Sequence, residues 1–267
     1  MTTTESRPLV GAPPRVLAWP AFEAERRATV SQGDHQLFVG PTQSGKTVLC
    51  RINVRDRKFT VVWGTKKRDP SLDAYLAEGY IRVDEWPPRH RLDWNGKRFV
   101  RRPFNYSKLG EEQGYLRLLL WPEIVNREDL RRHREQYARC LDSAFIDGGW
   151  TIVIDEGLWV ATRGGLGLDQ ELSQIAYGAA SNNVSLYLCM QRPSGMSRVT
   201  WSSVSDAYIF KSGVIDDIRE LAALGVSDPR DAVKVIQTQI RGHQFLHVPT
   251  RGQSKGWSIS EVDPRAI

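Results

Sequence analysis

The sequence contains few cysteines and no long apolar run. Its 267 residues include 3 cysteines, which are far apart in the chain and form no Cys-x-x-Cys pair. This usage predicts a reduced protein with neither a disulfide framework nor a structural zinc site. No apolar stretch approaches the ~20 residues that span a bilayer, and the polar N-terminal segment lacks a signal-peptide core. We therefore expect no membrane span and a cytoplasmic location.

The composition instead indicates a globular α/β protein. Hydrophobic residues make up 40% of the chain and charged residues 25%, and the mean hydropathy is -0.42. The length suffices for one large α/β domain or two small ones. The net charge of +6 and the isoelectric point near 9.3 favour a polyanionic partner such as nucleic acid. Because a bias in genome composition also enriches arginine, the charge alone does not select nucleic acid.

One eight-residue stretch carries the strongest functional signal. Residues 40–47 read Gly-Pro-Thr-Gln-Ser-Gly-Lys-Thr, the Gly-x-x-x-x-Gly-Lys-[Ser/Thr] pattern of a phosphate-binding loop. The glycines let backbone N–H groups turn toward a phosphate, Lys46 adds charge at the β and γ phosphates of ATP, and the Thr47 hydroxyl ligates Mg²⁺. The predicted nucleotide-binding residues are Gly40, Pro41, Thr42, Gln43, Ser44, Gly45, Lys46, Thr47 and Val48.

The segments on either side fit this loop. The mostly apolar run His35–Val39 predicts a buried strand, and Thr47–Ile52 predicts a helix whose N-terminus points at the phosphates. A glycine-rich turn without a ligand is the alternative interpretation. The strand before the loop and the helix after it favour nucleotide binding.

A second motif follows another predicted strand. Thr151–Ile154 is a run of strand-forming residues that ends in Asp155 and Glu156, the Walker B pattern. We expect Asp155 to hold Mg²⁺ through water and Glu156 to orient or deprotonate the water that attacks the γ-phosphate. A strand ending in Asp-Glu is common by itself, but its place after a phosphate-binding loop favours the catalytic interpretation.

Further strands and helices alternate along the chain. The clearest amphipathic helix covers 128–145 and stops at Gly148-Gly149. The strand at 184–190 ends in Gln191-Arg192-Pro193-Ser194, a place where glutamine or arginine beside a nucleotide senses the γ-phosphate. Other strands are predicted at 59–63, 117–121, 207–210 and 245–248, and other helices at 72–77, 169–182 and 216–224.

Two segments each support two interpretations. Residues 81–106 interleave basic and aromatic side chains, which suits contact with nucleic acid and equally a hairpin with one solvated face. Residues 157–168 are rich in glycine and predict a mobile loop. Such a loop either faces the central pore of a translocase or lies on the outer surface.

The order of these motifs resembles the FtsK/HerA superfamily of DNA-pumping ATPases. The phosphate-binding loop, the strand ending in Asp155-Glu156 and the strand ending in Gln191-Arg192-Pro193-Ser194 carry the resemblance, which covers about residues 36–224. It implies a RecA-like P-loop NTPase fold, an α/β fold with a mainly parallel sheet flanked by helices. In that fold the strand before Gln191 lies between the two Walker strands. The resemblance also implies a hexameric ring with ATP between subunits and DNA through the centre.

Site residues are carried over to the positions that match the family's motifs. The resemblance implies that Lys46 and Thr47 bind phosphate and Mg²⁺, and that Asp155 holds the metal. It also implies that Glu156 is the catalytic carboxylate and that Gln191 is the sensor of the γ-phosphate.

The chain departs from the family pattern at several positions. Gln43 stands where the loop usually has glycine, and Gly64-Thr65-Lys66 follows a strand after which many members carry aspartate. The arginine that a neighbouring subunit supplies to the γ-phosphate is not fixed by pattern. Arg219 is the preferred candidate, and Arg198 and Arg192 are the alternatives.

These inferences define one large domain and one leading function. We expect an N-terminal arm at 1–33, the ATPase domain at 34–250 and a C-terminal tail at 251–267. The leading function is a DNA-stimulated ATPase that translocates or packages DNA. Expected partners are duplex DNA bound without sequence preference, further copies in a hexameric ring and, for a virus, a portal or capsid protein in the host cytoplasm. The alternatives are a nucleotide-gated assembly or adaptor ATPase and a small-molecule phosphotransferase.

Overall fold

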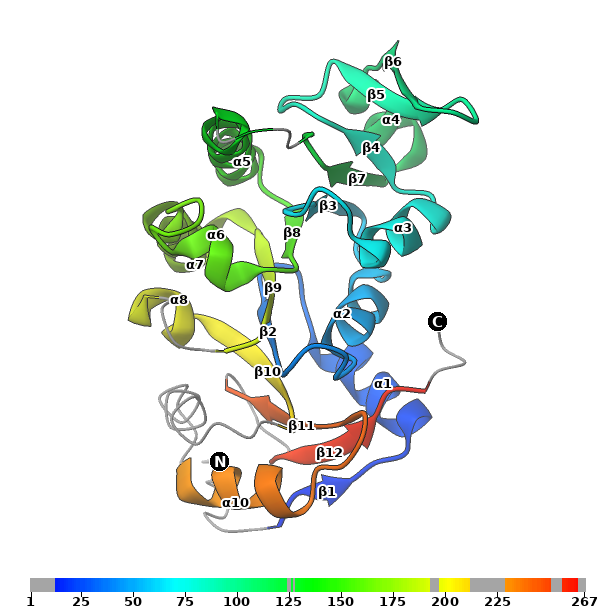
Figure 1. Ribbon diagram of the computed structural model, residues 1–267. Helices are drawn as coiled ribbons and strands as arrows, with labels where there is room; N and C mark the ends of the chain where they lie inside the picture. Colours follow the sequence, from blue (N-terminus) through cyan, green and yellow to red (C-terminus); the bar gives the residue numbers. More distant parts are fainter. Residues whose placement is uncertain are drawn as a thin grey trace, which may run out of the picture.

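A large, mostly parallel sheet organises the protein. The computed structural model describes residues 13–123, 126, 128–192, 197–211, 229–250 and 256–263. Within them a 10-stranded sheet has the order β1-β12-β11-β10-β2-β9-β8-β3-β7-β4, and β5 and β6 form a separate hairpin beyond its β4 end (Figure 1). The strands are β1 Arg15–Val16, β2 His35–Val39, β3 Phe59–Trp63, β4 Ile81–Val83, β5 His90–Trp94, β6 Phe99–Pro103, β7 Leu116–Leu120, β8 Trp150–Ile154, β9 Ser185–Met190, β10 Val204–Phe210, β11 Gln244–Pro249 and β12 Ser258–Glu261.

The strands from β10 to β4 run parallel, whereas β11 is antiparallel to both of its neighbours. The central strands β2, β8 and β9 are buried along their whole length, because helices cover both faces of a parallel sheet. Strand β9 lies between β2 and β8. The strand order implied by the family resemblance is therefore confirmed.

Helices pack on both faces of this sheet and build two cores. Helices α1, α2 and α3 contribute to the core on one face, and α5, α6, α7, α8 and α10 contribute to the core on the other (Figure 1). None of the described helices combines the length and apolar character that crossing a membrane requires. The helices are α1 Trp19–Thr29, α2 Lys46–Val54, α3 Pro70–Ala77, α4 Tyr106–Gln113, α5 Glu128–Asp147, α6 Gly157–Ala161, α7 Asp169–Asn182, α8 Arg198–Ser202 and α10 Pro229–Thr238.

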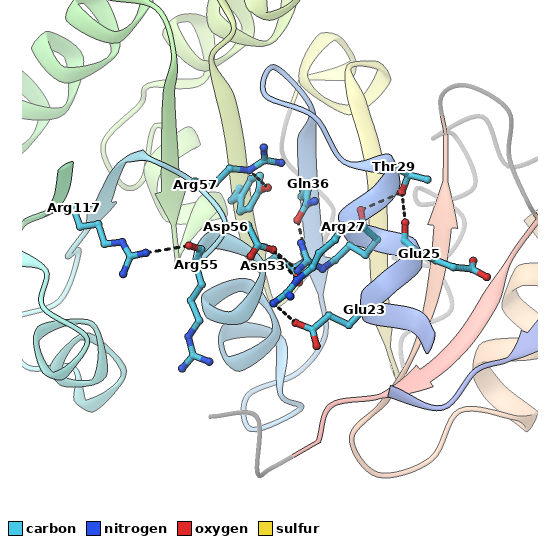
Figure 2. A network of polar contacts seen from close by, with 12 residues as sticks. Glu23, Glu25, Arg27, Thr29, Gln36, Asn53, Arg55, Asp56, Arg57 and Arg117 are labelled. Carbon is cyan, nitrogen blue, oxygen red and sulfur yellow. Dashed lines mark hydrogen bonds and ion pairs between the residues drawn. The ribbon is translucent and has the colours of Figure 1, made fainter. Parts of the chain in front are cut away.

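Residues before β2 take part in this packing. Phe22 of α1 is 1% exposed and lies edge-on to Phe245, with ring centroids 5.1 Å apart. The polar network in Figure 2 ties α1 to the end of α2, where the buried Arg26 donates to Asp56 at 2.7 Å and Arg27 contacts the same carboxylate at 3.4 Å. The domain boundary at residue 33 stays a prediction, but α1 is fastened to the sheet.

The glycine-rich segment 157–168 differs from the loop predicted for it. It begins with helix α6, and Leu166 and Leu168 are buried in the core. Backbone N–H groups of these leucines donate to Trp159 and Val160 at 3.0 Å, which folds the segment back onto α6. The buried leucines and the glycines together set this conformation, because Gly167 has φ +65° and a Cβ at Gly165 would clash with the Trp159 carbonyl oxygen. The helix predicted at 216–224 lies outside the described residues.

Candidate nucleotide site

Four parallel strands end at one edge of the sheet. Three of them are followed by predicted site residues, and the fourth is followed by a segment that departs from the family pattern. The phosphate-binding loop follows β2, Gln191 follows β9, Asp155 follows β8 and Gly64–Lys66 follows β3. Ligands of open α/β sheets bind at the carboxyl ends of the strands. The N–H of Gly40 donates to the carbonyl of Met190 at 3.1 Å, so the start of the loop lies directly beside the residue before Gln191.

The loop depends on backbone shapes that favour glycine. Gly45 has φ +101°, and a Cβ added at Gly40 would lie 2.7 Å from Cβ of Phe210. Gln43 has φ 65° although it is not glycine, a conformation that costs an L-residue roughly 1–2 kcal/mol. Gln43, which replaces the family's usual glycine, therefore keeps the backbone conformation that glycine would adopt without strain.

Polar groups of the loop are arranged to receive an anion. Helix α2 starts at Lys46, so its N-terminal N–H groups face the loop. Lys46 is 8% exposed, and its Nζ donates to the carbonyl of Pro41 at 3.3 Å. The buried Oγ of Ser44 has no hydrogen-bond partner among the described residues. A bound phosphate would satisfy these donors, which fits the nucleotide predicted from the motif.

Thr47 and Asp155, the two predicted Mg²⁺ ligands, are in contact. The Thr47 hydroxyl donates to Oδ1 of Asp155 at 2.7 Å, although the two residues are 108 positions apart. Burial raises the pKa of Asp155, and the hydrogen bond from Thr47 opposes that shift. Two protein oxygens beside a phosphate site fit Mg²⁺, which keeps waters and phosphate oxygens as its other ligands. The described residues hold no cluster of three or more histidine, cysteine or carboxylate ligands.

Glu156 forms an ion pair that the sequence did not predict. Its Oε1 lies 2.5 Å from Nζ of Lys66, on the segment that follows β3, the neighbour of β8. Burial lowers the pKa of Lys66, but the hydrogen bond and charge of Glu156, together with the charges of Asp69 and Asp155, outweigh it, so the pKa of Lys66 is raised. The indole Nε1 of Trp121 donates to the Lys66 carbonyl at 2.6 Å, and the Tyr137 hydroxyl donates to the Gly64 carbonyl at 2.6 Å. Two side-chain hydrogen bonds therefore hold the backbone segment that carries Lys66.

The remaining predicted residues are placed only in part. Gln191 and Arg192 are exposed directly after β9, at the edge where the site forms. Arg198 is the first residue of α8, and its side chain is not described. Arg219 lies outside the described residues. The choice among the three arginines stays a prediction.

A cavity beside the loop brings in two residues that the sequence did not predict. It measures about 270 Å³, and His243 and Val262 form a wall that faces the loop residues. His243 Nδ1 lies 3.3 Å from the carbonyl oxygen of Ser44. This mostly apolar cavity suits the base and sugar of a nucleotide. No sequence motif includes these two residues. His243 directly precedes β11, and Val262 directly follows β12. The lining residues from the loop and α2 are Gln43, Gly45, Lys46, Thr47 and Val48.

The strand order and the loop after β2 define a RecA-like P-loop NTPase fold. No family model and no curated protein matches this chain. Among solved structures, the chain is similar to the DNA-packaging ATPase B204 of Sulfolobus turreted icosahedral virus, with a TM-score of 0.53 and 14% identity over 86% of this chain and 98% of that one.

Two further solved structures are similar over most of their length. The packaging NTPase B204 of Sulfolobus turreted icosahedral virus 2, in complex with AMPPCP, has a TM-score of 0.52 and 12% identity over 86% of this chain and 98% of that one. VirB4 of Thermoanaerobacter pseudethanolicus has a TM-score of 0.54 and 11% identity over 87% of this chain and 90% of that one. At 11–14% identity these neighbours show the fold, and it is the RecA-like P-loop NTPase fold that the family resemblance implied.

Proposed function

We propose that this chain is an ATP-hydrolysing motor that translocates or packages DNA. The observation that carries the proposal is the contact between Thr47 and Asp155 at 2.7 Å, with Glu156 next in the chain. This contact assembles a phosphate-binding loop, a metal-binding carboxylate and a candidate base at one sheet edge. The likeness to a DNA-packaging ATPase and to VirB4 supports the choice of motor over other P-loop enzymes.

The chain's own groups account for the steps of hydrolysis. Lys46 and the N-terminus of α2 hold the β and γ phosphates, and Gln191 reaches the γ-phosphate from the adjacent strand end. Mg²⁺, held by Thr47 and Asp155, would neutralise charge on the phosphate oxygens when bound. Glu156 accepts a proton from the attacking water, whose oxygen bonds to the γ-phosphorus as the bond to ADP breaks.

The proposal includes a ring. An arginine from a neighbouring subunit stabilises the transferring phosphoryl group, and such a residue is worth ~10³-fold or more. Arg219 is our candidate. Mixing Arg219→Ala with Lys46→Ala, each inactive alone, should restore part of the ATPase activity, because some interfaces then combine an intact lysine with an intact arginine. Full activity of Arg219→Ala alone would transfer the role to Arg198 or Arg192.

The function is tested by the ATPase rate with and without duplex DNA. We expect hydrolysis that DNA stimulates and that Glu156→Gln abolishes. An ATPase rate that is the same with and without DNA would favour the nucleotide-gated assembly or adaptor ATPase. Transfer of the γ-phosphate to a small molecule instead of water would identify a phosphotransferase.

A further inference from the structure

A strongly basic cavity shares no lining residue with the cavity beside the phosphate-binding loop. It measures about 740 Å³ and is bordered by the hairpin β5–β6, the segment after β3 and the start of α5. The hairpin stands at the β4 end of the sheet, opposite the end that carries β1 and β12 (Figure 1). We name it the basic cavity. Seven basic side chains line it, Lys67, Arg68, Arg82, Lys97, Arg98, Arg101 and Arg132, together with the carboxylates of Asp84 and Glu123.

Most of this positive charge has no internal partner. Arg101 pairs with Asp84. Five other cations are exposed and lie within 4 Å of no carboxylate among the described residues, namely Lys67, Arg68, Lys97, Arg98 and Arg132. Like charges gathered at one concave surface raise the local potential and attract a polyanion. The cavity therefore carries an excess of positive charge that an external ligand can neutralise.

Arg82 is held rigidly at the wall of the basic cavity. Its guanidinium lies 4.2 Å from the ring centroids of both Phe99 and Trp121. Burial lowers the pKa of Arg82, and its Nε has no hydrogen-bond partner among the described residues. A guanidinium that is already positioned and only partly satisfied loses little conformational entropy when it binds a phosphate.

An exposed aromatic ring stands among these cations. Trp94 is 60% exposed at the end of β5, and its ring centroid lies 5.2 Å from that of Phe99. Aromatic rings beside cations recur in proteins that bind nucleic acid, because the cations meet the phosphates while the ring packs against bases or sugars.

We propose that the basic cavity is a DNA-binding site, with the strand backbone on Lys97, Arg98 and Arg132 and the sugar-base edge against Trp94. The proposal rests on the proposed function for its choice of DNA as the partner. An acidic polypeptide would satisfy the charges but would leave the indole without a matched surface.

The position of the cavity connects it to the nucleotide site. Lys67 and Arg68 directly follow Lys66, the residue that contacts Glu156. Trp121 lines the cavity and also donates to the Lys66 carbonyl. The wall of the cavity therefore includes the backbone segment that carries the partner of Glu156, and DNA that contacts Lys67 or Arg68 would act on that segment.

Fluorescence anisotropy with a labelled duplex of mixed sequence tests the site on the full chain without nucleotide. The double variant Lys97→Ala/Arg98→Ala removes two exposed cations at the hairpin tip. We expect DNA binding to weaken roughly tenfold and the log–log salt slope to shrink by about 2, since each lost phosphate contact removes about 0.9. The matched control Lys58→Ala/Arg139→Ala removes the same charges from exposed positions outside the cavity and should bind as the wild type does.

Equal weakening in both double variants would overturn the proposal, because binding would then follow net charge alone. Arg132→Ala, on α5, is a second variant that leaves the hairpin unchanged. If both Arg132→Ala and the double variant at the hairpin tip bind DNA with wild-type affinity, the proposal is also overturned. Polyglutamate that displaces the duplex as well as unlabelled DNA does would assign the cavity to an acidic polypeptide instead.

ATPase activity without DNA separates this inference from the proposed function. The tip variant should hydrolyse ATP at the wild-type rate when DNA is absent. If the wild type does not hydrolyse ATP, but the tip variant binds DNA more weakly than the wild type does, the proposed motor function is wrong and the DNA-binding site is supported. If the tip variant still hydrolyses ATP and DNA still stimulates it, the DNA-binding site is wrong and the proposed motor function is supported.

Discussion

The candidate nucleotide site and the basic cavity are both proposed to bind phosphate groups, yet they are built in different ways. The first uses one contiguous loop and a strand end, with Gly40 packed against Phe210 and Asp155 buried. The second gathers exposed cations from the hairpin, the segment after β3 and α5. A site that must place a γ-phosphate within an ångström demands specific residues at fixed spacing. A site that holds a DNA backbone demands only charge within reach, so many sequences satisfy it.

The difference predicts that single changes in the nucleotide site have far larger effects than single changes in the cavity. Glu156→Gln keeps the shape of the side chain and removes the base. We expect ATP binding to remain and hydrolysis to fall about 10²–10⁴-fold, the usual contribution of a positioned general base. Single-turnover hydrolysis and binding of a labelled ATP analogue measure the two steps separately.

Lys46→Ala provides the control for the Glu156 variant. It removes the charge on the β and γ phosphates and should abolish ATP binding itself. Near wild-type turnover by Glu156→Gln would mean that the Walker B assignment is wrong.

Lys66 lies between the two regions and should give an intermediate effect. Lys66→Ala removes the partner of Glu156, and we expect kcat to fall roughly tenfold with little change in KM for ATP, the loss of one charge-assisted hydrogen bond. Lys66→Arg should restore much of the rate, because it returns the positive charge. The exposed Lys58→Ala is the control, and a wild-type kcat in Lys66→Ala would show that the ion pair does not position Glu156.

The pH dependence of stability should reveal the buried carboxylate. The pKa of Asp155 is raised by burial, so the folded protein holds a proton at pH values where the unfolded chain has released it. Stability of the metal-free wild type should therefore rise, relative to Asp155→Asn, as the pH falls through the raised pKa toward the ordinary value of 3.8. Urea unfolding at a series of pH values measures this difference, and a difference that does not change with pH would contradict the assigned environment.

The smallest effect is expected at Gln43. The positive φ of Gln43 costs an L-residue roughly 1–2 kcal/mol, while glycine costs roughly 0.5–1 kcal/mol because it loses more backbone entropy on folding. Gln43→Gly should therefore stabilise the fold by up to about 1.5 kcal/mol. Asn183→Gly is the matched control at φ 54°, where asparagine already tolerates the conformation and a smaller gain is expected. Urea midpoints of both variants decide it. A larger gain at Asn183 would show that the loop conformation is not strained.

Much of the fold and half of the site follow from local patterns. Apolar runs marked β2, β3, β8 and β9, and the periodicity of α5 and α7 gave their bounds within a few residues. The contact between Thr47 and Asp155 follows from two motifs because parallel strands place both at one edge.

The remainder depends on neighbours that the sequence does not reveal. Lys66 contacts Glu156 only because β3 lies beside β8. His243 lies near the loop only because β11, which it directly precedes, runs antiparallel to β10. The short strands β1 and β12, at one end of the sheet, carry too few residues for a pattern. The helix at 157–161 was missed because glycines nearby outweighed the leucines that pack after it.

The central claim is that ATP hydrolysis drives movement along DNA, and displacement of a triplex-forming oligonucleotide from duplex DNA tests it directly. A translocating motor strips the third strand as it passes. We predict displacement by the wild type with ATP, none by Glu156→Gln, and slower displacement by Lys97→Ala/Arg98→Ala. Hydrolysis stimulated by duplex DNA without displacement of the third strand would contradict the account.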